Sequence, residues 1–132
     1  MKNVLTYGTF DLFHYGHLEL LRRAKSLGDR LYVGVSTDAF NLLKNKECIY
    51  SYTHRSAILR ALRYVDVVFP ETCWEQKADD VKKYHIDVFV MGDDWKGYFD
   101  EQLKGLCKVI YLPRTKGISS SFLREYIRSG RK

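Results

Sequence analysis

Residues 7–29, YGTFDLFHYGHLELLRRAKSLGD, join the end of an apolar strand to the start of an amphipathic helix. The strand is predicted over residues 2–7. A helix is predicted from about residue 16 to 27, because leucine and alanine recur there at helical spacing while arginine and lysine fall on the other face. Gly28 is expected to end that helix as its C-terminal glycine.

Outward from this stretch, strands and helices alternate to the end of the chain. Further strands are predicted over 30–36, 66–70, 87–92 and 108–113, and helices over 53–66, 75–84 and 119–129. Thr53 is the expected N-cap of the second helix. Apolar strands in this order predict an α/β fold, a Rossmann-like doubly wound sheet of about five parallel strands flanked by helices. We expect one domain over residues 1–132.

The expected ligand site lies beyond the carboxyl ends of the strands, near the point where strand order reverses. Residues 37–52 show no clear periodicity and are predicted to be a long loop, and loops of this length in small domains are usually functional or mobile. Two lysines in it, Lys44 and Lys46, are candidates to reach a phosphate, or they simply keep a surface loop soluble.

Composition narrows the function classes without choosing one. Lysine and arginine outnumber acidic residues by 22 to 16, a net charge of +6 that favours an anionic partner. Cys48, Cys73 and Cys107 form no paired motif, so neither a disulfide framework nor a zinc site is expected. No run is apolar and long enough for a membrane helix and no signal-peptide pattern opens the chain, so we expect a cytoplasmic protein without membrane insertion.

The two histidines of the opening stretch, His14 and His17, precede or begin the first helix. Backbone N–H groups at a helix start attract phosphates, and a protonated or hydrogen-bond-donating imidazole adds to that attraction. A phosphate clamp is therefore the favoured interpretation. Two alternatives are a metal pair, for which no further ligand lies close in sequence, and plain structural histidines.

Five segments together resemble a known family. YGTFDLFHYGH (7–17) is similar to the first signature of the nucleotidylyltransferase superfamily, and RTKGISSS (114–121) to its second. RYVD (63–66), WEQK (74–77) and MGDDW (91–95) resemble one branch, the glycerol-3-phosphate cytidylyltransferases of teichoic acid and capsule synthesis. The resemblance extends from residue 2 to about 128.

The resemblance implies transfer of CMP from CTP to a phosphomonoester, with the CDP-alcohol and pyrophosphate as products. It implies catalytic roles for His14, His17, Lys44 and Arg114. The resemblance places Asp94 in the cytosine pocket, where a hydrogen-bond acceptor on the protein would distinguish cytosine from uracil. The nucleotide-binding residues implied are Thr9, Phe10, His14, Gly16, His17, Arg63, Gly92, Asp94, Arg114, Thr115, Gly117, Ile118, Ser119 and Ser120.

The acceptor-binding residues implied are Asp11, Asp38, Lys44, Lys46, Arg63 and Trp74. Glycerol 3-phosphate is the expected acceptor, and another small phosphorylated alcohol is the alternative. Mg²⁺ is implied by the triphosphate, whose own oxygens would supply most of the ligands, so we expect no metal ligands from the protein. A homodimer is implied by the family alone.

This chain departs from the family at two positions of the second signature. Lys116 stands where an acidic residue is common, and Ser120 stands where threonine is common. Serine keeps the hydroxyl, and lysine either adds charge near the triphosphate or is merely exposed. Two other functions remain as alternatives: an adenylyltransferase, against which the MGDDW segment argues, and a basic nucleic-acid-binding module, against which the scattered basic residues argue.

Overall fold

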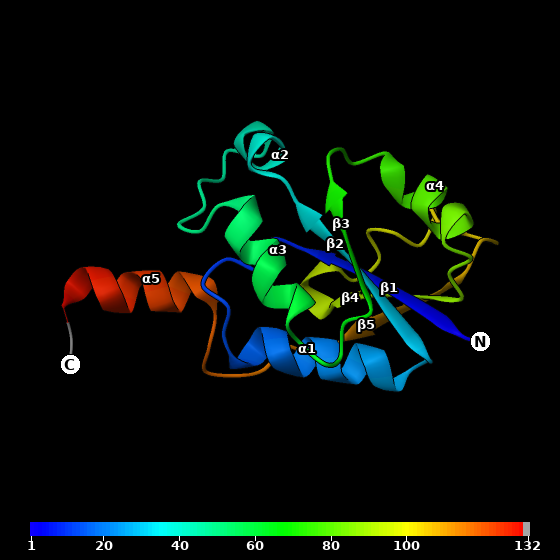
Figure 1. Cartoon of the computed structure of the whole chain (residues 1–132), viewed down its shortest axis with the longest axis horizontal. Helices are drawn as coiled ribbons and strands as arrows, with labels where there is room; N and C mark the ends of the chain where they lie inside the picture. The colour runs from blue at the N-terminus through cyan, green and yellow to red at the C-terminus, as the bar shows by residue number, and fades with distance from the viewer. Residues whose placement is uncertain (131–132) are drawn as a thin grey trace.

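A computed structural model of the chain describes residues 1–130 (Figure 1). It contains five strands, six helical segments and the loops between them. In chain order these are β1 Asn3–Gly8, α1 Tyr15–Ser26, β2 Arg30–Ser36, α2 Asp38–Leu43, α3 Tyr52–Arg60, β3 Val67–Glu71, α4 Gln76–Lys83, β4 Val88–Gly92, the 3₁₀ turn η1 Asp93–Trp95, β5 Lys108–Leu112 and α5 Ser120–Ser129.

All five strands are parallel and lie in the order β3-β2-β1-β4-β5. The chain moves outward from β1 through β2 to β3, and then returns to the other side of β1 for β4 and β5. Strand order therefore reverses between β1 and β4, which creates a crevice at their carboxyl ends. The predicted single-domain, doubly wound α/β fold is confirmed; the last two residues of its predicted range lie outside the described ones.

Each face of the sheet is covered, which explains why the strands are apolar over nearly their whole length. One core cluster joins the side of the sheet that carries Val4 and Val33 to Leu21 of α1 and Leu59 of α3. The opposite cluster contains Leu5 and Phe89 of the sheet, packed against α4 and the segment after η1. Alternate residues of one strand thus belong to different cores.

Helix boundaries differ from the sequence prediction at three places. Residues 37–52 are not wholly a loop, because α2 forms there with Thr37 as its N-cap. The next helix begins after Ser51, whose hydroxyl caps it instead of Thr53, and it ends at Arg60 instead of residue 66. A helix of six residues is too short for its hydrophobic periodicity to be recognised in a sequence.

Gly28 directly follows the end of α1, as predicted, but it does not adopt the left-handed conformation that is common for a glycine at that position. The C-cap of α1 is Leu27, which has ordinary right-handed dihedral angles. Glycine is required at position 28 because a Cβ there would lie 2.7 Å from the Val4 side chain and 2.8 Å from the Lys2 carbonyl oxygen. The residue permits close packing of the α1–β2 turn against the start of β1.

Helix α5 projects from the body of the molecule at the carboxyl-end side of the sheet (Figure 1). None of its side chains is buried, and Phe122 and Ile127 are exposed. Among residues 1–130, no helix combines the length and apolar character needed to cross a membrane.

Candidate active site

A cleft of about 610 Å³ opens at the carboxyl ends of β1, β4 and β5. Its walls come from the loop after β1, the start of α1, residues 45–48, the turn after β4 and the segment from 112 to 124. This is the crevice that the strand order creates. Most of the residues that the sequence had assigned to nucleotide binding line it: Thr9, Phe10, His14, Gly16, His17, Gly92, Asp94, Arg114, Thr115, Ile118, Ser119 and Ser120.

The two histidines cap the first helix with their own imidazoles. His14 is the N-cap of α1, and its Nδ1 accepts a hydrogen bond from the Gly16 amide at 3.0 Å. His17 Nδ1 accepts from the His14 amide at 3.2 Å, and the two rings stack with their centroids 3.8 Å apart. This reciprocal arrangement is a capping box in which imidazole nitrogens replace the usual side-chain oxygens.

These bonds fix the tautomer of both rings. An Nδ1 that accepts a hydrogen bond carries no proton, so in the neutral ring the proton lies on Nε2. Burial, followed by the neighbouring His14, lowers the pKa of His17 to about 3. Burial and then the Arg114 charge lower the pKa of His14 as well. Both shifts favour the neutral, donating imidazole over the protonated form, the two states that the sequence had left open.

The loop before the two histidines is strained, and a glycine leaves room for one of their rings. Phe10 and Leu12 adopt left-handed φ angles of 56° and 49°, and non-glycine residues in that region are typical of functional sites. At Gly16, an added Cβ would lie 2.8 Å from His14 Cε1. Gly16, which the resemblance assigns to nucleotide binding, is therefore needed first to admit the His14 ring itself.

Asp11 ties the opening loop to two distant segments. Its buried carboxylate accepts hydrogen bonds from the Ile49 amide at 2.8 Å and the Tyr50 amide at 2.9 Å, and it pairs with the Arg124 guanidinium of α5. Burial opposes ionisation, but the bonds from Tyr50, Ile49 and Arg124 outweigh it and lower the pKa of Asp11. With both oxygens engaged by the protein, Asp11 organises the site, whereas the resemblance had implied that it binds the acceptor.

The second signature forms the outer wall of the cleft. Arg114 is exposed and lines the cleft, and Gly117 has a left-handed φ of 84° within the turn that leads into α5. Ser119 caps α5 by accepting from the Phe122 amide at 3.0 Å. Ser120 Oγ donates to the Asp11 carbonyl at 2.6 Å. The Ser119 hydroxyl can therefore still donate a hydrogen bond to a ligand, whereas the Ser120 hydroxyl already donates to the protein.

The turn after β4 supplies the wall opposite α1. Gly92 and Asp94 line the cleft there, and Asp94 lies in η1 with its carboxylate exposed. A Cβ at Gly92 would lie 2.8 Å from the Asp94 carboxylate. Gly92 therefore allows Asp94 to fold back over the end of the strand, beside the cleft in which the resemblance implies that Asp94 contacts the base.

The candidates for the acceptor are divided between the cleft and its surroundings. Lys46 lines the cleft. Lys44 and Trp74 lie beside it: the Lys44 ammonium sits 5.4 Å from the Trp74 ring, which packs on Trp95 of the cleft wall. Burial is the main reason why the pKa of Lys44 is lowered. The opposite charge of Glu71 raises this pKa, and the like charges of Lys46 and Lys77 lower it further.

Asp38 is not among the residues that line the cleft, so the structure gives no support to direct contact with the acceptor. Its carboxylate accepts from the Tyr52 amide at 3.0 Å and pairs with Arg55 at 2.8 Å. The hydrogen bond from the Tyr52 amide lowers the pKa of Asp38 most, and the bond from Arg55 lowers it further. Asp38 instead joins the start of α2 to the start of α3.

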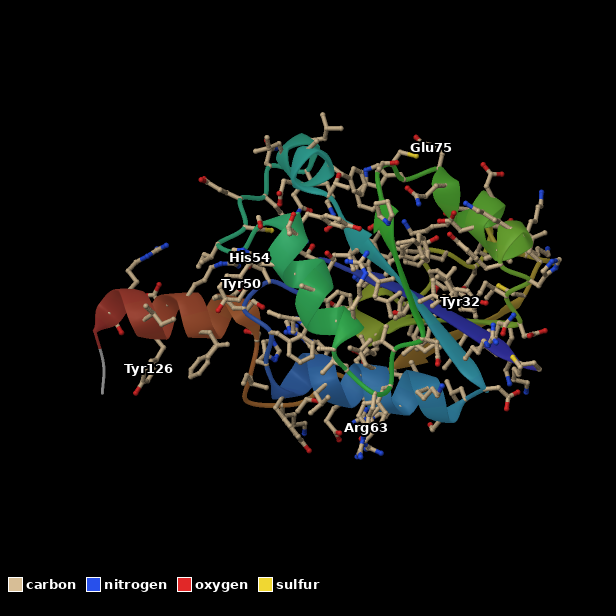
Figure 2. All side chains as sticks on the ribbon, in the orientation of Figure 1. Tyr32, Tyr50, His54, Arg63, Glu75 and Tyr126 are labelled. Carbon is tan, nitrogen blue, oxygen red and sulfur yellow. The ribbon has the colours of Figure 1, made fainter. Side chains whose placement is uncertain are left out.

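Arg63 is not brought to the cleft within this chain. It follows α3 and precedes β3, at the amino end of the strands, whereas the cleft lies at their carboxyl ends. Its guanidinium stacks on the Tyr64 ring and donates to the Tyr64 hydroxyl. Figure 2 shows it pointing outward near α1, on the other side of the molecule from α2. The predicted contacts of Arg63 with nucleotide and acceptor are therefore wrong for a single chain.

Three buried or bridging cations escaped the sequence analysis. Arg55 is fully buried and donates to the carbonyls of Tyr50, Thr9 and Ser36, so it fastens the loop after β1 to the loop before α3. Arg124 ties α5 to Asp11. Lys77 is buried against Glu71. For Arg55 a signal existed, because it lies four residues before Leu59 on the inward face of α3.

Among residues 1–130, no group of three or more histidine, cysteine or acidic side chains is arranged to hold a metal ion. The cleft-lining carboxylates are those of Asp11, Glu47 and Asp94, and Asp11 is already engaged by the protein. The cationic side chains of Lys46 and Arg114, which also line the cleft, match phosphate oxygens.

Fold and site together define a nucleotide-binding cleft of the HxGH kind. A family model described as cytidylyltransferase-like matches residues 5–126, and the chain belongs to this family. The resemblance seen in the sequence is confirmed. Among solved structures, the lipopolysaccharide core biosynthesis protein of Thermoplasma volcanium GSS1 shares the fold, with a TM-score of 0.78 and 25% identity over 88% of this chain and 99% of that chain.

Two curated relatives extend the likeness over about 95% of the chain. A glycerol-3-phosphate cytidylyltransferase of Bacillus subtilis (strain 168) is 60% identical over 127 residues, covering 96% of this chain and 98% of the relative. One from Staphylococcus aureus (strain NCTC 8325 / PS 47) is 57% identical over 125 residues, covering 95% and 94%. An ethanolamine-phosphate cytidylyltransferase of Arabidopsis thaliana is 41% identical over 87 residues, covering 64% of this chain and 21% of the relative.

Proposed function

We propose that this protein transfers CMP from CTP to glycerol 3-phosphate, forming CDP-glycerol and pyrophosphate. The observation that carries the proposal is the pair of backbone-anchored imidazoles, His14 and His17, in a cleft that Lys46 and Arg114 also line. The near full-length likeness to glycerol-3-phosphate cytidylyltransferases supports the choice of both substrates.

In the proposed reaction a phosphate oxygen of the acceptor attacks the α-phosphorus of CTP in line with the departing group. The new phosphorus–oxygen bond forms as the bond to the β-phosphate breaks, and its electron pair leaves with pyrophosphate. The acceptor oxygen already carries charge, so neither a general base nor a covalent enzyme intermediate is required. Catalysis then consists of positioning and of stabilising negative charge.

His14 and His17 suit that task because their Nε2–H groups are fixed before the substrate arrives. Donors that need no reorientation stabilise a growing charge at little cost. Arg114 and the start of α5, where Ser119 keeps a free hydroxyl proton, would bind the β- and γ-phosphates. The amino end of α1 adds its dipole to the same region.

Asp94 and the backbone at Gly92 would receive the cytosine. A carboxylate or carbonyl oxygen can accept a hydrogen bond from the exocyclic amine of cytosine, whereas uracil has no amine to donate. Lys44 and Lys46 would bind the phosphate of the acceptor and carry the remaining charge of the triphosphate. Thr9 and Phe10 contribute to the floor of the cleft.

Mg²⁺ is proposed as the companion of CTP, where it would neutralise part of the triphosphate charge. CTP is a cytoplasmic metabolite, so the reaction is proposed to occur in the cytoplasm. The CDP-glycerol formed would serve as the donor for teichoic acid or capsule polymers. We also propose a homodimer; sedimentation that gives a monomer at micromolar concentration would reject this last part.

The test is pyrophosphate release in the presence of Mg²⁺, with CTP, UTP or ATP against glycerol 3-phosphate and other phosphorylated alcohols. We expect rapid release with CTP and glycerol 3-phosphate only. Turnover with CTP and a different acceptor would contradict the acceptor assignment, and turnover with ATP would favour an adenylyltransferase. No release with any pair, together with salt-sensitive binding of RNA or DNA, would favour the nucleic-acid-binding alternative.

A further inference from the structure

Ser36, the last residue of β2, carries a buried hydroxyl that the proposed reaction does not use. The residue is 1% exposed and is not among those that line the active-site cleft. Its hydroxyl donates a hydrogen bond to Thr9 Oγ1 at 3.1 Å. Thr9 does line the cleft. A group outside the cleft is therefore bonded to a group that the substrates would meet.

The fold brings Ser36 and Thr9 side by side. Gly8 of β1 pairs with Val35 of β2, and the next residues along the two segments are the serine and the threonine. Arg55 holds them there, because its Nη1 donates to the carbonyls of both residues at 2.8 Å. The backbone on both sides of the hydroxyl pair is thereby fixed.

The direction of the bond between the two hydroxyls follows from the burial of Ser36. Each hydroxyl has one proton to donate. Among residues 1–130, Thr9 Oγ1 is the one hydrogen-bond partner of the Ser36 hydroxyl. If Thr9 donated instead, the Ser36 proton would be buried without an acceptor, which is costly. The Thr9 hydroxyl therefore keeps its own proton, and the cleft is where an acceptor can reach it.

The Thr9 hydroxyl lies on the same side of the cleft as the two histidines. The ring of the next residue, Phe10, packs on that of His17 with 5.4 Å between their centroids. A hydroxyl that accepts one fixed bond and still has a proton to give is a donor whose orientation is set before the substrate binds. Phosphate oxygens are the acceptors to which such donors are suited.

We propose that Ser36 is a positioning residue of the transfer reaction. By donating to Thr9 Oγ1, it directs the Thr9 hydroxyl proton into the cleft, where that hydroxyl donates to an oxygen of the phosphate that is transferred. The inference rests on the proposed function, because it concerns the reacting phosphate of CTP, but it does not depend on which acceptor is used. Without Ser36, the Thr9 hydroxyl is free to rotate, and its stabilisation of the transition state is reduced.

The first test measures kcat and KM for CTP in Ser36→Ala by steady-state pyrophosphate release. The kcat is expected to fall about tenfold with a smaller change in KM, because Thr9 is no longer oriented in advance. Ser56→Ala is the matched control, since Ser56 is also 1% exposed and its hydroxyl donates to the Thr53 carbonyl, away from the cleft. An unchanged kcat in Ser36→Ala, or an equal loss in both variants, would overturn the proposal.

A double-mutant cycle separates positioning from a purely structural contribution. Thr9→Val removes the hydroxyl through which Ser36 acts and should lower kcat about 10–10²-fold. In the Thr9→Val protein, Ser36→Ala should cause no further loss of kcat, because its partner is already gone. Thr9→Ser retains the hydroxyl and should recover most of the activity that Thr9→Val loses. Independent, additive losses in the double variant would contradict action through Thr9.

Ser36→Cys covers the case in which Ser36→Ala does not fold. The thiol keeps the space beside Thr9 filled, but it is only a weak hydrogen-bond donor. The kcat should therefore fall in Ser36→Cys while the melting temperature stays near that of the wild type. A wild-type kcat in this variant would overturn the proposal.

Nuclear magnetic resonance reads the two hydroxyls without catalysis. In a mixture of H₂O and D₂O, a hydroxyl that exchanges slowly with solvent gives separate Cβ resonances for its protonated and deuterated forms. Ser36 should show such splitting in the free protein, and Thr9 should show it only after CTP and Mg²⁺ are added. In Ser36→Ala, CTP should not split the Thr9 resonance. An unsplit Thr9 resonance in the wild type at saturating CTP would contradict the contact with phosphate.

These measurements distinguish failure of the inference from failure of the proposed function. If the wild type releases no pyrophosphate with CTP and glycerol 3-phosphate, but CTP splits the Thr9 resonance, the proposed reaction fails and the positioned donor stands. If the wild type turns over, and neither kcat nor the Thr9 resonance responds to Ser36→Ala, the reaction stands and the role of Ser36 is rejected.

Discussion

The two walls of the cleft that would hold the triphosphate are built in opposite ways. The β1–α1 junction is fixed locally: His14 and His17 bond to backbone amides within the same turn, and Gly16 leaves room for one ring. No residue of the 114–124 segment is buried, and the segment carries α5 outside the body of the molecule. Its described ties to the rest of the site are the bonds of Ser120 and Arg124 to Asp11.

The difference indicates a division of labour. A wall that is rigid before the substrate binds is suited to stabilising the transition state, because its donors need no reorganisation. A wall held by a few long-range bonds is suited to admitting and retaining the nucleotide, because it can move. The junction should therefore govern kcat, and the outer wall should govern KM for CTP.

The largest expected effect is that of His17→Ala. Loss of one fixed donor to the reacting phosphate should lower kcat about 10²–10³-fold while changing the affinity for CTP much less. Steady-state pyrophosphate release and equilibrium CTP binding measure the two quantities. His54→Ala, an exposed histidine of α3, is the control. An unchanged kcat in His17→Ala would remove this residue from the mechanism.

Gly16→Ala tests the same wall without removing a functional group. The new Cβ would approach His14 Cε1 to 2.8 Å, so the ring must shift. A displacement of this order in a positioned group should lower kcat by about tenfold or more. Tyr15→Ala, at the neighbouring exposed position, should leave kcat near the wild-type value. Equal kcat values for both variants would mean that the His14 position is not critical.

Arg124→Ala tests the outer wall. Without its partner on Asp11, α5 loses one of its ties to the site, so KM for CTP should rise about tenfold with a smaller change in kcat. Arg124→Lys should recover part of the loss, since the charge is retained. Arg128→Ala is the matched control, because its guanidinium is exposed on the same helix. A drop in kcat alone would contradict the division of labour.

The smallest effect concerns stability. The pKa of His17 is about 3 in the folded protein and is expected near its ordinary value when unfolded. When the pH falls below that ordinary value, His17 is protonated in the unfolded chain but stays neutral in the folded protein, so the free energy of unfolding decreases as the pH falls. Urea unfolding should show the wild type losing about 1 kcal/mol more than His17→Asn between pH 6 and pH 5. Parallel losses would argue for an ordinary His17 pKa.

Much of this site was readable from sequence because its residues are local. Hydrophobic periodicity gave the five strands and the main helices, and HxGH at a strand–helix junction gave the phosphate site. Arg63 shows the limit of the approach. A sequence motif does not say where a side chain points, and this residue lies at the amino end of the strands, opposite the cleft. The ties of Asp11 to Arg124 and of Arg55 to Thr9 join residues 113 and 46 positions apart, and no periodicity encodes such pairs.

The protonation state of the two imidazoles tests the central claim most directly. Nitrogen-detected NMR of imidazole-labelled protein, with His14 and His17 assigned through single variants, distinguishes the neutral tautomers and the charged form. We predict that both rings carry their proton on Nε2 alone at neutral pH, with Nδ1 unprotonated. A charged ring, or a proton on Nδ1, would contradict a site built from neutral donors anchored by the backbone.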